Sequence, residues 1–207
     1  MSEAPLPLTA DERALIKDTS FFRAKVAIGK KVKENLLALH EALKEELALS
    51  SLLAPEGTDL QNGQFVKGEH LQDFPYQYLD FPKFFSHDEK FTFRSLFWWG
   101  HHFVFAWILE GAHLEEYKKN LLSSYDQLAD QGLSILLAPT PWEWRNHPEL
   151  ILKIQSGNKG AVAEAVAPRP WLKVQRIIGF DHPLFVENRL TEAGRETFRL
   201  MKAIVSA

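Results

Sequence analysis

The stretch Phe91–Leu109, FTFRSLFWWGHHFVFAWIL, constrains the fold more than any other part of this chain. It is almost continuously apolar and dense in aromatic residues, which are enriched in strands. The pair Gly100-His101 interrupts it, and glycine at the first position of a two-residue loop fits a type II′ turn. We therefore predict a central β-hairpin with both faces mostly apolar and covered.

The position of the turn determines which residues of the hairpin face each other. A loop at Gly100-His101 places Arg94 opposite Trp107, where a cation–π contact can form. It also places Trp98 opposite Phe103. A shift of one residue would exchange the two faces of one strand, so these pairings depend on the turn.

Three amphipathic segments predict helices that pack against the hairpin. Apolar residues recur at spacings of three and four over Phe22–Leu49, including Phe22 and Val26 at its start. The same period recurs over His113–Asp130 and over roughly 191–205. Thr9 and Glu12 form a capping box that predicts a further short helix near the N-terminus.

The long segment has two features that leave alternatives open. Gly29 lies on its apolar stripe, either as a point of close packing or as a break in the helix. Basic residues between Arg23 and Lys33 precede acidic residues between Glu41 and Glu46, against the helix dipole. The basic cluster is either an anion-attracting patch or a solvated face, and solvated faces are the commoner case.

Further strands complete the predicted sheet. Pro75 and Pro82 bound one of them and favour strand ends or an edge position. Asn146 and Glu149 can cap a helix over Pro148–Gln155. The expected strands are Gln64–Val66, Tyr76–Phe81, Leu133–Ala138 and Trp171–Phe180. We predict an α+β fold with a largely antiparallel sheet, in one domain over 1–207, with residues 1–8 as a loose arm.

Composition excludes several classes of protein. The chain has 207 residues, 45% apolar and 25% charged, which are ordinary globular values. It has no cysteine, which excludes disulfides and cysteine-based metal sites and fits a cytoplasmic protein. A net charge of −3 gives no reason to expect nucleic acid as a partner. The N-terminus does not resemble a signal peptide, and no apolar run is long enough for a membrane span.

The order of these elements resembles a known family. The long amphipathic helix precedes a Trp99-Gly100-His101-His102 turn, the aromatic strand Phe103–Trp107 and the helix segment Glu115–Lys119. A tryptophan-containing loop with a histidine and a late LKVQRIIGF strand follow. This pattern is similar to the YktB-like bacterial proteins, a family without assigned function. The resemblance covers roughly Phe22–Phe180 and implies a single α+β domain, with no activity attached.

Three polar features stand out against the aromatic background. Imidazoles such as His101 and His102 bind metals and carry protons near neutral pH, but adjacent strand residues point to opposite faces. No HExxH or HxH spacing is present, so we expect no metal and no cofactor. Arg94 lies in an apolar strand, either as an anchor for a carboxylate or phosphate or in an ion pair with a helix carboxylate.

The loop Trp142-Glu143-Trp144-Arg145-Asn146-His147 is the third feature. Large aromatic residues in loops either pack or bind a ligand. Trp142, Trp144, Arg145 and His147 could line a pocket, with Glu143 and His147 as an acid–base pair. Alternatively, the tryptophans anchor the loop as a lid over the core.

Two hypotheses follow from these residues. The first is a domain that binds a small anionic or aromatic molecule between the hairpin and the tryptophan loop, with no reaction assigned. Its candidate ligand-binding residues are Arg94, His101, His102, Trp142, Trp144, Arg145 and His147. The second is an interaction or structural module without a ligand site, for which a homodimer is one arrangement.

Overall fold

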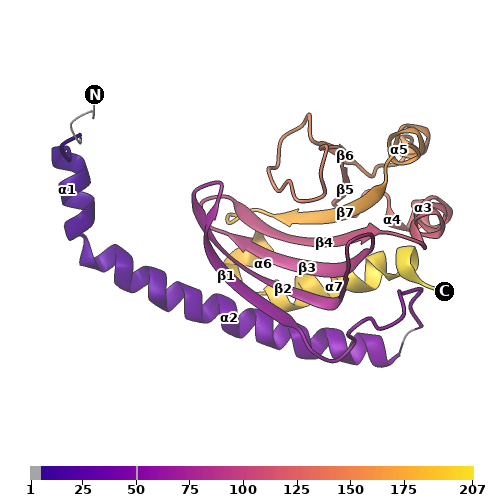
Figure 1. Cartoon of the computed structure of the whole chain (residues 1–207), viewed down its shortest axis with the longest axis horizontal. Helices are drawn as coiled ribbons and strands as arrows, with labels where there is room; N and C mark the ends of the chain where they lie inside the picture. The colour runs from indigo at the N-terminus through magenta and orange to yellow at the C-terminus, as the bar shows by residue number, and fades with distance from the viewer. Residues whose placement is uncertain (1–5, 50) are drawn as a thin grey trace.

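A computed structural model describes residues 6–49 and 51–207 and shows an α+β fold (Figure 1). The predicted capping box is confirmed, because Thr9 and Glu12 each accept a hydrogen bond from the other's backbone N–H. Part of the predicted arm over residues 1–8 lies outside the described residues. The helices are α1 (Ala10–Lys17), α2 (Thr19–Ala48), α3 (Leu114–Ser123), α4 (Tyr125–Leu128), α5 (Lys159–Val166), α6 (Pro183–Val186), α7 (Leu190–Met201) and the 3₁₀ turn η1 (Lys202–Val205).

Within the described residues, the strands form one antiparallel sheet of seven. Their order is β1-β2-β3-β4-β7-β5-β6, so the late strand β7 lies between β4 and β5. The strands are β1 (Gln64–Leu71), β2 (Phe74–Phe85), β3 (Lys90–Trp98), β4 (His102–Glu110), β5 (Leu133–Leu136), β6 (Ile151–Lys153) and β7 (Trp171–Ile178).

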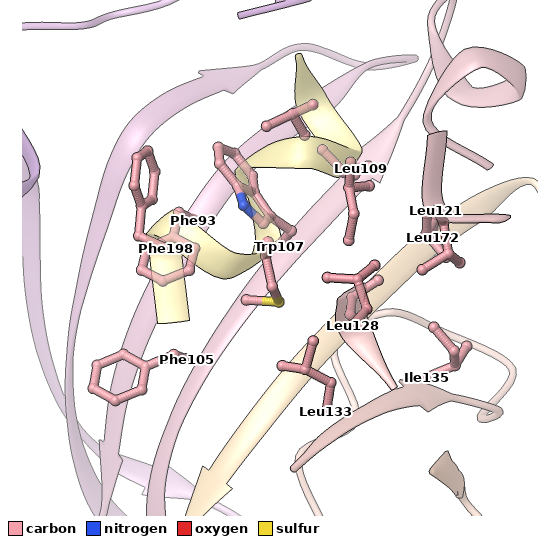
Figure 2. Packing of buried hydrophobic residues seen from close by; sticks show 14 of the residues in the cluster. Phe93, Phe105, Trp107, Leu109, Leu121, Leu128, Leu133, Ile135, Leu172 and Phe198 are labelled. Carbon is pink, nitrogen blue, oxygen red and sulfur yellow. The ribbon is translucent and has the colours of Figure 1, made fainter. Parts of the chain in front are cut away.

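One face of the sheet carries the larger hydrophobic core, beneath α2 and α7 (Figure 1). Figure 2 shows Phe93 and Trp107 of the sheet beside Phe198 of α7. The ring centroid of Phe198 lies 5.2 Å from that of Phe93 and 5.7 Å from that of Trp107. Such offset and edge contacts are the arrangements that aromatic rings prefer. The central hairpin is therefore confirmed as the core of the fold.

The opposite face is covered by the loop between β5 and β6, residues 137–150 (Figure 1). Trp144 of this loop joins a smaller apolar cluster with Trp98 and Val104 of the hairpin. Strand pairing also brings mostly polar residues into one row across this face. The row consists of Asp80, Arg94, Ala106, Gln175, Ser134 and Lys153.

The predicted register of the hairpin is wrong by one residue. Trp98 pairs with His102, so the turn contains Trp99, Gly100 and His101 rather than two residues. Gly100 adopts a φ of 72°, in the left-handed region that glycine enters without strain. Both faces of the hairpin are apolar, so the hydrophobic pattern does not distinguish one register from the next.

Two further predictions along the chain are wrong. Pro148–Gln155 contains the strand β6 instead of a helix, because its backbone pairs with β5. β2 runs through Pro75 and Pro82 instead of ending at them. The register of β2 against β3 shifts between Asp80 and Lys83, and such an irregularity accommodates the missing N–H of Pro82.

The long helix α2 has a buried half and an exposed half. Val32, Leu36 and Leu43 are buried, whereas Phe22 and Val26 are exposed, although they lie on the same predicted stripe. In Figure 1 the start of α2 and all of α1 project beyond the sheet. Gly29 does not break the helix, and a Cβ there would lie 3.2 Å from the side chain of Gln77. No described helix combines the length and the apolar character that a bilayer span requires.

Candidate functional site

A cavity of about 990 Å³ lies at one end of the sheet, on the face opposite α2 and α7. Its floor includes His102 at the start of β4, Ser134 in β5 and Ile177 near the end of β7. Arg145 and His147, from the loop over residues 137–150, form part of its wall. The cavity therefore brings together four predicted ligand-binding residues, namely His101, His102, Arg145 and His147.

His101 is held in a fixed orientation at the cavity. Its imidazole stacks on Trp98 with ring centroids 3.6 Å apart, and Phe74 meets it edge-on at 4.7 Å. Burial lowers the pKa of His101 below its ordinary value. The ring is therefore an oriented, neutral group at pH 7, able to donate one hydrogen bond and accept another.

His102 is more deeply placed and is only 4% exposed. Burial, with a smaller effect of His101, lowers the pKa of His102 to about 4, and the Trp144 backbone opposes this shift. Among the described residues, Nε2 of His102 has no hydrogen-bond partner. A buried polar atom without a partner is uncommon in folded proteins and calls for an explanation.

Arg145 and His147 lie at the more exposed wall. Arg145 pairs with Glu143 through two hydrogen bonds of 3.0 and 2.6 Å. These bonds lower the pKa of Glu143 to about 2 and raise that of Arg145. His147 lies 3.9 Å from a carboxylate oxygen of Glu149. The proposed acid–base pair of Glu143 and His147 is therefore not formed, because Glu143 is bound to Arg145.

The cavity also contains residues that were not among the predicted ones. Lys153 is exposed, and no ion-pair partner for its ammonium lies among residues 6–49 and 51–207. Ser134 interrupts the apolar LSILLA strand, a sequence feature that could have identified it. Asp130 accepts hydrogen bonds from the backbone and side chain of Ser156, so its carboxylate supports the loop after β6.

Arg94 does not line this cavity. Its Nε and Nη2 donate to the two carboxylate oxygens of Asp80 at 2.7 and 2.6 Å. The partner is thus a strand carboxylate, not the helix carboxylate of our prediction. Arg94 lies opposite Ala106 rather than Trp107, and its guanidinium stacks on Tyr78 at 3.8 Å. A bidentate, stacked arginine of this kind is already engaged by the protein.

The tryptophans of the loop lie over this ion pair instead of in the cavity. Trp144 is 4% exposed and packs on Lys173, whose Nζ lies 3.2 Å from its ring centroid. Trp142 is 38% exposed and lies 5.1 Å from the guanidinium of Arg94. Trp144 thus anchors the loop as a lid, while Trp142 stays partly open to solvent.

Lys173 of β7 holds the loop over residues 137–150 in place. Its Nζ donates to the carbonyl oxygens of Pro141 at 3.2 Å and Glu143 at 2.7 Å. Burial, and to a smaller extent Arg94, lowers the pKa of Lys173 well below its ordinary value. Because the same loop carries Arg145 and His147, this clamp positions one wall of the cavity.

Within residues 6–49 and 51–207, no group of three or more acidic or histidine side chains is arranged to hold a metal ion. Comparisons with protein-family models, with curated proteins and with solved structures give no match. The resemblance to the YktB-like proteins therefore stays a prediction. Any proposal about function has to come from the geometry of the cavity.

Proposed function

We propose that this protein binds a small molecule with a carboxylate or phosphate group in the cavity at the end of the sheet. The observation that carries this proposal is the convergence of His101, His102 and His147 around one space of about 990 Å³ with Lys153, for which the described part of the chain offers no ion-pair partner. Small-molecule sites are typically concave, of this size, and contain a few convergent polar groups. A cytoplasmic location belongs to the same proposal.

The charge for anion binding comes mainly from Lys153. Arg145 is largely neutralised by Glu143, and His102 is neutral at pH 7 because its pKa lies near 4. His101 and His147 then supply hydrogen bonds, whereas Nε2 of His102 is buried beneath the floor and closed to solvent. Arg94, Trp142 and Trp144 support the lid and do not contact this ligand.

A binding experiment tests this proposal. Phosphate, citrate and benzoate are titrated by calorimetry and by thermal shift, with sodium chloride at matched ionic strength. We expect at least one anion to raise the melting temperature, and Lys153→Met and His147→Ala to weaken its binding at least tenfold. Loss of one charge-assisted contact has about this effect.

Matched controls separate binding from general effects on the fold. Lys31→Met removes another exposed lysine, and His87→Ala removes another exposed histidine that lies beside a carboxylate. Both controls should keep the affinity of the unaltered protein. The proposal fails if no anion binds, or if Lys153→Met binds as tightly as Lys31→Met.

A further inference from the structure

The N-terminal segment over residues 10–33, the basic arm, exposes an apolar surface. α1 has no buried residue, and the first turns of α2 project past the edge of the sheet (Figure 1). Large apolar side chains of the arm lie in solvent. They are Leu15, Ile16, Phe21, Phe22, Val26 and Ile28. Contiguous exposed apolar residues of this kind mark an interaction surface.

Isolated helices of this length are not stable without tertiary contacts. An eight-residue helix such as α1 is below the roughly 12–15 residues that an isolated helix needs in water. The arm contacts its own body at Lys25, which pairs with Glu69, at Gly29, which lies close to Gln77, and at Val32, which is buried in the main core. These contacts fix its direction and leave the residues before Lys25 beyond the sheet.

The charges indicate which surface the arm fits. It contains seven Lys and Arg and three Asp and Glu residues, a net charge of +4, which leaves −7 for the rest of a chain whose total is −3. Opposite charges on two parts of one chain favour association between copies. The body also exposes single apolar residues, among them Phe65 beside His40 of α2 and Phe85 beside Trp142 of the loop over residues 137–150.

We propose that the basic arm docks on the body of a second copy of this chain, giving a twofold dimer with exchanged arms. Its apolar stripe continues the stripe of α2 that packs on the protein's own sheet. In a closed twofold dimer each arm is bound by the other copy, so neither arm stays exposed to solvent. A membrane of anionic lipid fits less well, because the net charge of −6 over residues 34–207 would be repelled.

The mass of the full chain in solution tests the dimer. Light scattering after gel filtration should give about 47 kDa, twice the 23.7 kDa of one chain. Val26→Ser should weaken dimerisation at least tenfold, because it removes apolar area from the interface. Val186→Ser is the matched control, since Val26 is 62% and Val186 69% exposed, and it should leave the dimer unchanged.

The charge of the arm and the solvent accessibility of its apolar side give two independent tests of the dimer. Lys30→Glu with Lys31→Glu should weaken the dimer, and added salt should weaken the dimer of the unaltered chain. Because the chain has no cysteine, Val26→Cys introduces a single thiol, and its labelling by a maleimide should slow as protein concentration rises.

These measurements distinguish an arm that docks on a second copy from an arm that stays free and from an arm that binds a membrane. A mass of 23.7 kDa at every concentration would overturn the proposal. So would a dimer that Val26→Ser leaves intact while circular dichroism shows a native spectrum. Flotation of a monomer with phosphatidylserine vesicles, abolished by Val26→Ser, would assign the arm to a membrane instead.

Discussion

Several charged side chains of this protein are buried. Burial determines how much each of them contributes to the stability of the fold. Arg94 and Asp80 form a bidentate pair with side chains 10% and 1% exposed, under the loop over residues 137–150. Burial raises the pKa of Asp80, although Arg94 acts in the opposite direction. The pair resembles other buried ion pairs, in which desolvation offsets much of the attraction.

Removing one member of the buried pair should destabilise the protein strongly. Asp80→Ala leaves the guanidinium of Arg94 buried without its carboxylate, which costs about 3–5 kcal/mol of unfolding free energy. Glu187→Ala breaks the solvent-exposed contact with Arg189 and should cost much less unfolding free energy than Asp80→Ala. Urea denaturation of both variants measures the difference. Equal losses would show that Arg94 finds another partner.

His102 should make stability depend on pH. Its folded pKa is about 4, below the value of about 6.5 in an unfolded chain. Between these values the unfolded chain binds one proton more, so stability rises with pH. We expect the unfolding free energy to fall on the order of 1 kcal/mol per unit as pH drops from 6.5 to 4.5.

The variant His102→Gln should reduce this dependence to the smaller slope that comes from His101. Glu46 and Glu143 have folded pKa values of about 2, so their contributions are lost mainly below pH 4.5, whereas the lowered pKa of His101 contributes to the slope inside the window. His87→Gln, at an exposed position, is the control and should keep the slope. An unchanged slope in His102→Gln would assign the proton to another group.

The sequence identifies candidate site residues, but it does not identify the side chains that contact them in the folded protein. His101, His102, Arg145 and His147 were identified as polar exceptions in aromatic segments, and they share one cavity. Lys153 was missed because its segment was predicted to be a helix. The partner of Arg94 was assigned wrongly because Asp80 comes from a neighbouring strand, and such pairing depends on register.

Among the elements, α7 and α2 pack closely at a glycine. A Cβ on Gly194 of α7 would lie 2.7 Å from a side-chain atom of Leu39 and 2.8 Å from one of Phe105. The packing of α7 against both α2 and the sheet therefore depends on the absence of a side chain there. The amphipathic patterns predicted both helices, but the patterns do not report interhelical distances.

Two glycine-to-alanine variants should have opposite effects. Gly194→Ala should destabilise the protein by about 1–3 kcal/mol, because overpacking displaces Leu39 or Phe105. Gly160→Ala in α5 meets no atom within 4 Å and should stabilise by up to about 1 kcal/mol through helix propensity. Thermal and urea unfolding measure both. A Gly194→Ala protein as stable as the unaltered chain would mean that the helices move apart at little cost.

At the level of the whole molecule, hydrogen bonds join segments that are far apart in the sequence. The backbone N–H of Leu53 donates to the carbonyl of Val205, and the hydroxyl of Tyr117 donates to the carbonyl of Leu53. Asn120 donates to the carbonyls of Ile204 and Ser206. The segment after α2, the middle helix and the C-terminus thus share one set of contacts.

We therefore expect the body to unfold as a single unit. Tryptophan fluorescence, which reports on the sheet, and far-ultraviolet circular dichroism, which reports largely on helices, should give the same denaturation midpoint. Two separated transitions would contradict the prediction of one domain over 1–207. The fold class was predictable because aromatic strands and amphipathic helices have distinct periods. The sheet order was not, because β7 pairs with strands distant in sequence.

The position of β7 has a consequence for synthesis of the chain on the ribosome. β4, which carries Phe103, Phe105 and Trp107, is complete at residue 110, but its second neighbour ends at residue 178. At about 5–20 residues per second, roughly 3 to 14 s pass between these points. During this interval β4, an apolar strand, is an open edge on the nascent polypeptide, so we expect chaperones that recognise exposed apolar strands to bind it there.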